Sequence, residues 1–212
     1  MANINLHLGD CMEAMAKMPD NAYDLAIVDP PYGSDADAVK KEFDNSNKRA
    51  AKRTFYHHFN NVAPTEEYFV ELNRVSKNWI VWGGNFFGLK GGVIAWNKNG
   101  TAFGEGEVAI CSTHASVRFF EHTWNGMIQQ DMKNKEHRIH PTQKPVALYK
   151  WLLHNYAKEG DKILDTHGGS MSIAIACHDM GFDLDLWELD KEYYENGVKR
   201  FKQHTAQTRL EL

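Results

Sequence analysis

One succession of residues near the end of the chain constrains the fold more than any other feature. Residues 162–165 (KILD) have the pattern of a buried strand, residues 170–181 (SMSIAIACHDMG) that of a helix ending at a glycine, and residues 182–190 (FDLDLWELD) that of a second strand. A helix between two strands is typical of a parallel βαβ unit, because the crossover must pack back onto the sheet. We therefore expect a parallel sheet.

The remaining elements extend this alternation. Strands are expected at 24–29, 78–84 and 91–98, and helices at 65–76, at 144–160 with Gly160 as the stop, and from residue 191 onward. The segments EVAICST and SVRFFEHTW are strand-like and separated by a short polar turn, which predicts a β-hairpin. Strands that alternate with helices predict an α/β fold with a doubly wound, mostly parallel sheet.

The length of 212 residues predicts a single domain, residues 1–212, with loop-rich segments at 33–61 and 99–139. Residues 33–61 are polar and charged without a clean period, so we expect a surface loop with some helix. Between residues 40 and 53 this segment carries six basic residues against two acidic ones, although the whole chain has a net charge of −4. Such a loop either contacts phosphates or is a solvated charged surface.

The turn before the helix at 170–181 carries Gly168 and Gly169, and Glu188 stands at the end of the next strand. Glycines there let a ligand approach the backbone, and the helix start supplies unpaired N–H donors. An acid about 20 residues further on suits the hydroxyls of a ribose. The pattern fits a nucleoside site, and a plain tight turn explains it equally well.

The stretch DPPY follows the apolar run LAIV, and Asp29 therefore stands at a strand end, where ligands bind in doubly wound sheets. Pro30 and Pro31 fix the backbone and remove two N–H donors, which leaves carbonyls as acceptors. Tyr32 adds a rigidly placed aromatic face. Acceptors beside such a face suit a planar ring with an exocyclic amine, such as a base flipped out of a duplex. A Pro-Pro turn at a strand end is the simpler alternative.

Cysteines and histidines give no pattern for a metal or a disulfide framework. Cys11, Cys111 and Cys177 are odd in number and far apart, and the eleven histidines show no ligand spacing. We therefore predict no metal and a reducing, cytoplasmic location. The N-terminus lacks the pattern of a signal peptide, and no apolar run is long enough to cross a membrane.

Taken together, the motifs resemble the S-adenosylmethionine-dependent amino-methyltransferases that act on DNA. DPPYG resembles the catalytic motif of that family, and HPTQKP (140–145) the motif that opens the cofactor-side helix. DTHGGS is similar to the cofactor loop DPFxGSG, WELDKEYYE to the ribose-binding strand end, and LGDCMEAM to the segment that contacts the cofactor adenine. Their order is that of the β-type group, and the resemblance covers about residues 6 to 203.

The resemblance implies a Rossmann-like class I methyltransferase fold, S-adenosylmethionine as the cofactor and double-stranded DNA as the partner. It implies that the target amine is bound and activated by Asp29, Pro30, Pro31 and Tyr32. It implies that the cofactor is bound by Asp10, Cys11, Asp29, Thr142, Lys144, Asp165, His167, Gly168, Gly169, Ser170 and Glu188. DNA contacts are then expected from 33–61, with Lys48, Arg49, Lys52 and Arg53 as candidates, and from 99–139 as a compact target-recognition region. A homodimer is compatible with the resemblance.

The cofactor loop departs from the family pattern at three positions. Thr166 and His167 stand in place of Pro-Phe, and Met171 replaces a glycine. These departures leave a catalytically silent nucleic-acid-binding module as an alternative from another functional class. The retained Asp29 and Glu188 favour an enzyme.

The aspartate of DPPY favours the N6 amine of adenine, since N4-cytosine enzymes of the group more often resemble SPPY. N4-cytosine methylation stays open as the first alternative. Methylation of RNA or of a protein amide is less compatible, because those relatives usually carry NPPY after the glycine loop. The resemblance is compatible with a bacterial or phage-encoded enzyme, including one of a restriction-modification system.

Overall fold

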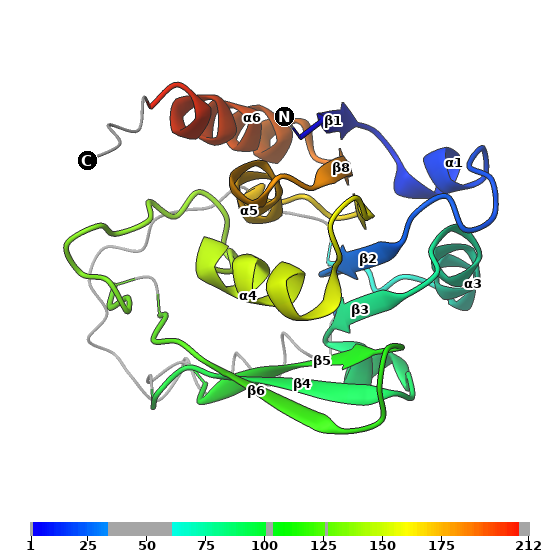
Figure 1. The fold of residues 1–212 in the computed structure, drawn as a ribbon, viewed down its shortest axis with the longest axis horizontal. Coiled ribbons are helices and arrows are strands. Elements are labelled where there is room, and N and C mark those ends of the chain that lie inside the picture. The colour runs from blue at the N-terminus through cyan, green and yellow to red at the C-terminus, as the bar shows by residue number, and fades with distance from the viewer. Residues whose placement is uncertain (1, 34–60, 101–103, 126, 208–212) are drawn as a thin grey trace.

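The computed structural model describes residues 2–33, 61–100, 104–125 and 127–207, and these carry one eight-stranded sheet (Figure 1). The strand order is β1-β8-β7-β2-β3-β5-β4-β6. The strands span Ile4–Leu8 (β1), Leu25–Val28 (β2), Trp79–Trp82 (β3), Gly92–Asn97 (β4), Gly106–Cys111 (β5), Val117–Glu121 (β6), Lys162–Asp165 (β7) and Asp183–Glu188 (β8). Neighbouring strands are parallel except where β5 pairs with β3 and β4.

Helices cover both faces of the sheet, with α4, α5 and α6 on one face and α1 and α3 on the other (Figure 1). They span Cys11–Met15 (α1), Glu66–Val75 (α3), Val146–Tyr156 (α4), Ser172–Met180 (α5) and Lys191–Thr205 (α6), and a 3-10 helix, η1, spans Gly84–Phe87. The predicted doubly wound, mostly parallel α/β fold is confirmed. None of the helices in the described ranges has the length and apolar character to cross a membrane.

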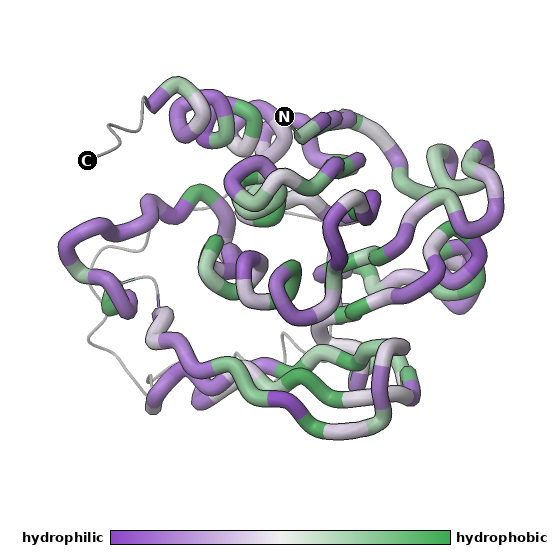
Figure 2. Tube along the Cα trace, viewed as in Figure 1, coloured by the Kyte–Doolittle hydropathy of each residue, from purple (hydrophilic) through white to green (hydrophobic). Residues whose placement is uncertain are grey.

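Two hydrophobic cores result from the alternation of side chains along the central strands. In β2, Leu25 and Ile27 belong to the core under α4 and α5, and Ala26 and Val28 belong to the core under α1 and α3. The central strands are correspondingly hydrophobic along their length (Figure 2). Burial on both faces explains why LAIV is a continuous apolar run rather than an alternating one.

The predicted hairpin between the segments EVAICST and SVRFFEHTW is wrong. These segments form β5 and β6, but β4 lies between them, antiparallel to β5 and parallel to β6. Every second residue of β4 is buried, whereas Phe120 is the one buried residue of β6. The more apolar strand therefore takes the central position, and β6 becomes the edge of the sheet.

Two further differences concern element ends. The helix expected at 144–160 ends at Tyr156, and Gly160 follows in a turn with a φ of +87°. β1 and α1 were not predicted. β1 is short, and its five residues are all partly or fully exposed, without a clean alternation. The loop expected at 33–61 lies almost entirely outside the described residues.

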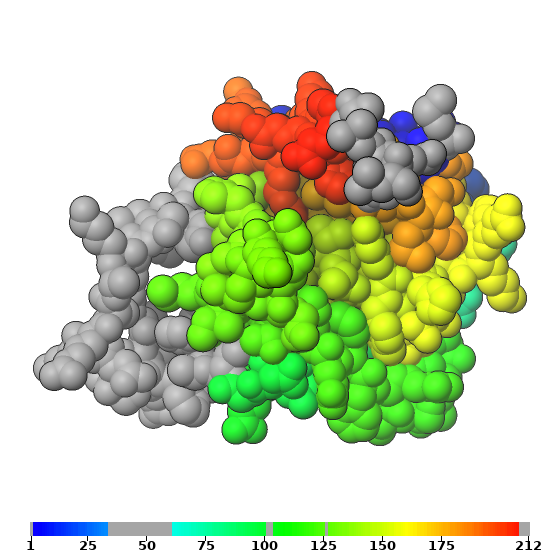
Figure 3. Space-filling view, turned by 60° about the vertical axis from the view of Figure 1, so that its left-hand side comes forward, coloured from blue at the N-terminus to red at the C-terminus, as the bar shows by residue number. Residues whose placement is uncertain are grey.

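The chain between β6 and α4 covers the surface between α6 and the antiparallel part of the sheet (Figure 3). Two contacts hold it there. Glu136 forms an ion pair with Arg200 of α6 at 2.6 Å, and the Trp124 indole donates to the carbonyl of Gln143 at 2.9 Å. This segment therefore packs against the α/β core as part of the same body, and it leads into the HPTQKP motif.

Candidate active site

The direction in which the chain adds strands to the sheet reverses between β7 and β2, which are adjacent and parallel. From β7 the chain continues outward through β8, whereas from β2 it continues the other way through β3. In doubly wound sheets, ligands bind at such a switch point, outside the carboxyl ends of the strands, and we call this region the crevice. Asp165 ends β7 and Asp29 directly follows β2, so the two predicted acids lie at the two sides of this crevice.

Asp29 has a partner on each carboxylate oxygen. The Tyr32 hydroxyl donates to Oδ1 at 2.7 Å, and the Lys144 ammonium forms an ion pair with Oδ2. Burial and the negative charge of Asp29 raise the pKa of Tyr32 well above its usual range, so this hydroxyl stays a donor. Each carboxylate oxygen has two acceptor positions, and a further donor can therefore reach Asp29.

The ring of Tyr32 is held between a glycine and two phenylalanines. A Cβ on Gly83, which has a φ of +65°, would come within 2.3 Å of the Tyr32 ring. Phe86 stacks on Tyr32 with ring centroids 5.2 Å apart, and Phe87 meets it edge-on at 6.2 Å. These phenylalanines were not predicted, although the GGNFFG stretch after a strand end was a visible signal.

Lys144 is a deeply buried charged group of the site, with 2% of its side chain exposed. It contacts Asp29, lies 3.2 Å from a carboxylate oxygen of Glu107, and has its ammonium 5.3 Å from the centre of the Trp82 ring. Burial lowers the pKa of Lys144, but the carboxylates of Asp29 and Glu107 outweigh burial and raise it overall. Lys144 is therefore a charged ammonium beside the predicted catalytic acid.

The rest of HPTQKP forms a rigid approach to α4. Thr142 is exposed, and its hydroxyl lies 3.1 Å from Nδ1 of His140. Gln143 is buried and accepts from the backbone N–H of Ile139 at 3.0 Å. His140 meets Tyr193 of α6 edge-on at 4.3 Å, and burial lowers the pKa of His140 to about 4. The motif therefore fixes Lys144 between α4 and the end of β2.

The glycine loop after β7 is held by backbone hydrogen bonds. The N–H of His167 donates to Asp165 at 2.9 Å, and the N–H of Gly169 donates to Glu188 at 2.6 Å. A Cβ on Gly168 would come within 2.3 Å of the Leu186 side chain, so this position requires glycine. Glu188 and Asp165 thus fix the loop that the sequence assigns to a nucleoside ligand.

Met171 takes the place of the family's last loop glycine and keeps a glycine-like backbone. Its φ is +57°, in the left-handed region that side chains disfavour. Its side chain is fully buried and packs against Gly197 of α6, where a Cβ would lie 2.8 Å from the Met171 Cγ. The substitution therefore preserves the shape of the loop, with Gly197 making the room.

Burial controls the charges at the glycine loop. It raises the pKa of Asp165 to about 8, and the nearby carboxylates of Asp29 and Glu188 add to the effect, while the His167 N–H opposes it. Burial also raises the pKa of Glu188 and lowers the pKa of His167 to about 4. At neutral pH the imidazole of His167 is uncharged, and the carboxyl group of Asp165 is mostly protonated.

Asp10 and Cys11 lie where β1 ends beside β8. Asp10 is exposed and caps α1 by accepting from the Met12 N–H at 2.7 Å. Gly9 donates to the Glu188 carbonyl at 2.9 Å, which brings this turn next to Glu188. Burial and the charge of Asp10 raise the pKa of Cys11 to about 12. The thiol is therefore uncharged at neutral pH and is not activated as a nucleophile.

The predicted DNA contacts Lys48, Arg49, Lys52 and Arg53 lie outside the described residues. No site residue was predicted at Lys98 or Glu107, and the structure joins them to the site. Lys98, at the end of β4, forms an ion pair with Glu107 of β5, which in turn contacts Lys144. The signal in the sequence was an acid near the start of an otherwise apolar strand.

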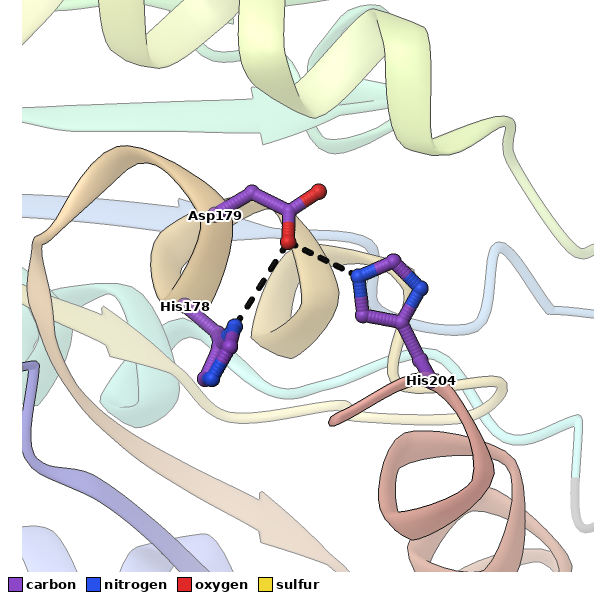
Figure 4. Close-up of side chains that lie close together, drawn as sticks. All are labelled: His178, Asp179 and His204. Carbon is purple, nitrogen blue, oxygen red and sulfur yellow. Dashed lines mark hydrogen bonds and ion pairs between the residues drawn. The ribbon is translucent and has the colours of Figure 1, made fainter. Parts of the chain in front are cut away.

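A second charged cluster lies on the helices, away from the crevice (Figure 4). Asp179 of α5 accepts from Lys150 of α4 at 2.6 Å and contacts His204 of α6 at 2.7 Å, with His178 at 3.5 Å. Within the described residues, His178, Asp179 and His204 are the one group with metal-ligand atoms close enough together, within 4.8 Å. Lys150 already neutralises the carboxylate, and we interpret the cluster as a tie between three helices.

Comparison with known proteins places the site in a family. The profile of the N6/N4 methyltransferases, described as DNA methylases, matches residues 51–199, which is more than half of the chain. The chain belongs to this family. These enzymes use S-adenosylmethionine to methylate amines of DNA bases, as the sequence predicts. The matched segment includes HPTQKP, the glycine loop and Glu188 but begins after DPPY, so the role of Asp29 depends on the geometry of the crevice.

Individual relatives agree with this assignment. The chain is 21% identical to the type II methyltransferase M2.MboI of Moraxella bovis, over 96% of this chain and 89% of that protein. A shorter segment is 37% identical to the type II methyltransferase M.HpaI of Haemophilus parainfluenzae, but it spans only 21% of that protein.

Solved structures show the same fold. The M1.HpyAVI complex with S-adenosylmethionine superimposes with a TM-score of 0.58 and 18% identity, over 93% of this chain and 99% of that one. The cytosine-N4-specific PvuII DNA methyltransferase superimposes with a TM-score of 0.62 and 12% identity, over 97% and 91% of the two chains. These neighbours confirm the methyltransferase fold.

Proposed function

We propose that the chain transfers the methyl group of S-adenosylmethionine to the exocyclic N6 amine of an adenine flipped out of double-stranded DNA. The observation that carries the proposal is the crevice between β7 and β2. Asp29, hydrogen-bonded to Tyr32, lies at one side of it, and the glycine loop with Asp165 lies at the other. An acceptor for an amine and a glycine loop suited to a nucleoside therefore lie at the two sides of one switch point.

The residues of the crevice fit the cofactor by their chemistry. Glu188 and Asp10 supply carboxylates for ribose and adenine, at the ends of the adjacent strands β8 and β1. Asp165 supplies a buried carboxyl group, which the positive charge of a ligand ammonium group would ionise. When bound, S-adenosylmethionine supplies an electrophilic methyl group on a sulfonium, and its cationic charge suits a crevice lined by acids.

On the target side, Asp29 and the carbonyl of Pro30 accept hydrogen bonds from the amine N–H groups, which localises the nitrogen lone pair. The base stacks on the face of Tyr32 once Phe86, which stacks on this ring, has moved aside. Placement of the amine in line with the methyl group supplies most of the rate, since little proton transfer is needed before attack. The product nitrogen then loses one proton, for which the Asp29 carboxylate or water is the acceptor.

The DNA side of the proposal depends on the basic segment. Lys48, Arg49, Lys52 and Arg53 follow DPPYG in sequence and are proposed to contact phosphates next to the flipped base. Replacing all four with alanine should weaken DNA binding and reduce its salt dependence, as measured by binding titrations at several salt concentrations. An unchanged salt slope would place the contacts elsewhere. The type II relatives support a restriction-modification role in the cytoplasm of a bacterium or a phage host.

The N4 amine of cytosine is the second candidate target. The structural neighbour PvuII DNA methyltransferase is cytosine-N4-specific, and its fold matches over most of both chains. Asp29 in DPPY favours adenine, because the cytosine enzymes of this group more often resemble SPPY. A silent binding module is the weaker alternative, since Met171 leaves the loop in its glycine-like shape.

Transfer of a tritiated methyl group to unmethylated genomic DNA, followed by digestion to nucleosides, tests the proposal. Label in N6-methyladenine is the expected result. Label in N4-methylcytosine would keep the chemistry and change the base. Cofactor binding without any label in DNA would contradict DNA as the substrate under these conditions and direct the search to other amines.

A further inference from the structure

A line of four alternating charges ends at the catalytic acid. Lys98 at the end of β4 pairs with Glu107 of β5, Glu107 contacts Lys144, and Lys144 pairs with Asp29. The two cations and two anions neutralise one another. Nothing in the family motifs assigns a role to Glu107, which lies opposite Trp96 in the β4–β5 ladder.

Lys144 is shared between the two carboxylates. Its Nζ lies 3.2 Å from Glu107 Oε2 and pairs with Asp29 Oδ2, while the ring of Trp82 lies 5.3 Å away. Burial alone would raise the pKa of Glu107, but the ammonium groups of Lys144 and Lys98 outweigh burial and lower it to about 2. Glu107 is therefore an anion throughout the physiological range.

The sharing of Lys144 between two carboxylates matters because Asp29 has to accept a hydrogen bond from the target amine. An ammonium that pairs with one carboxylate alone draws that carboxylate toward itself and weakens it as an acceptor for other donors. Glu107 contacts the same ammonium from 3.2 Å, farther than Asp29 lies, and competes with Asp29 for its charge. The Tyr32 hydroxyl occupies only one acceptor position of Oδ1, and the remaining positions stay available.

We propose that Glu107 is a positioning residue for methyl transfer: by sharing Lys144 with Asp29, it keeps the Asp29 carboxylate placed and available for the target amine. This inference rests on the proposed function of Asp29. It predicts a larger effect of Glu107 on the chemical step than on cofactor binding, because its ion pair with Lys144 leads to Asp29.

The test is Glu107→Gln, which keeps the shape and removes the charge. We expect kcat for methyl transfer to fall by about 100-fold, the loss typical of a displaced reactive group, while the cofactor Kd changes less than about 3-fold. Glu107→Asp should recover part of the rate. Glu71→Gln, which breaks the ion pair with Arg74 on α3, is the matched control and should retain wild-type kcat.

A charge-compensated variant separates positioning from simple charge balance. Glu107→Gln leaves one excess positive charge, which Lys98→Gln in the same chain removes. The double variant should regain thermal stability, measured by its Tm, but keep the low kcat. Restoration of kcat in the double variant, or a wild-type kcat in Glu107→Gln, would overturn the proposal. A parallel loss of cofactor affinity would also overturn it.

These outcomes are distinct from failure of the proposed function. A wild-type enzyme that transfers no label to DNA refutes the function itself, before any variant is compared. An active wild type with an unaffected Glu107→Gln variant refutes only the role of Glu107.

Discussion

The two sides of the crevice are built in opposite ways. At the end of β2, Asp29 is held by charge, through Lys144 and the ion pairs behind it. At the end of β7, the glycine loop is held by backbone hydrogen bonds to Asp165 and Glu188 and by close packing, with Gly168 against Leu186 and Met171 against Gly197. The side proposed to act on the amine thus depends on ionised groups, and the side proposed to bind the cofactor depends on close packing. Substitutions should separate the two sides.

The largest effect is expected from the charged side. Asp29→Ala should lower kcat by at least about 1,000-fold, because the acceptor for the target amine is lost. The cofactor Kd should stay within about 3-fold, since the glycine loop is not altered. Methyl-transfer assays measure kcat, and calorimetric titration of the same preparation measures the cofactor Kd. An Asp29→Ala enzyme with wild-type kcat would refute the assignment.

Two glycine variants make the comparison direct. Gly83→Ala would press a Cβ into the Tyr32 ring, and Gly168→Ala would press one into Leu186. We expect Gly83→Ala to reduce kcat by about 100-fold with little change in cofactor Kd. We expect Gly168→Ala to raise the cofactor Kd by about 10-fold, or about 1.4 kcal/mol, with a smaller change in kcat. Equal effects on both constants in both variants would show that the two sides are not separable.

The placement of the two sides of the crevice could largely be predicted from the sequence. The βαβ pattern and the strand before DPPY were sufficient to place Asp29 and Asp165 at strand ends of one parallel sheet. Glu107 could not be predicted, because its partner Lys144 comes from a distant segment and only the pairing of β5 with β3 brings them together. The hairpin prediction failed for a related reason: the local turn was visible, but the competition between β4 and β6 for the central position was not.

Met171 illustrates the same limit. The sequence shows that a glycine is replaced and suggests a weakened loop, but the compensating Gly197 lies on α6, after the next strand. Only the three-dimensional packing shows that the methionine side chain has its own space.

Asp165 predicts a pH dependence of stability. Its pKa is about 8 in the folded chain and near 3.8 when unfolded, so the folded state retains a proton that the unfolded state has lost, and stability falls as pH rises toward 8. His140 and His167, with pKa values of about 4, change stability only below about pH 6.5. Between pH 6.5 and 8 the free energy of unfolding should therefore fall by about 1.5 kcal/mol through Asp165.

Urea unfolding at several pH values measures this loss, with Asp165→Asn as the control that lacks the titrating group. The free energy of unfolding of the unmodified chain, relative to that of Asp165→Asn, should fall as the pH rises from 6.5 to 8. A constant difference would mean that Asp165 does not titrate there.

The smallest expected effect is the difference in stability between two variants of Met171, which reports on the backbone at this position. Met171→Ala should lower the free energy of unfolding by about 3 kcal/mol through the lost buried side chain. Met171→Gly should cost about 1 kcal/mol less, because glycine relieves the left-handed conformation. Urea unfolding of the two variants measures the difference. A glycine variant less stable than the alanine variant would contradict the φ of +57° assigned to this position.

The central claim is that both sides form one working site despite the altered glycine loop, and calorimetric titration of the unmodified chain with S-adenosylmethionine tests it most directly. The account predicts saturable binding of one molecule per chain, with a Kd that Asp29→Ala leaves nearly unchanged and Gly168→Ala weakens. Absence of binding would contradict it, and the chain would then be a nucleic-acid-binding module that has kept the fold without the reaction.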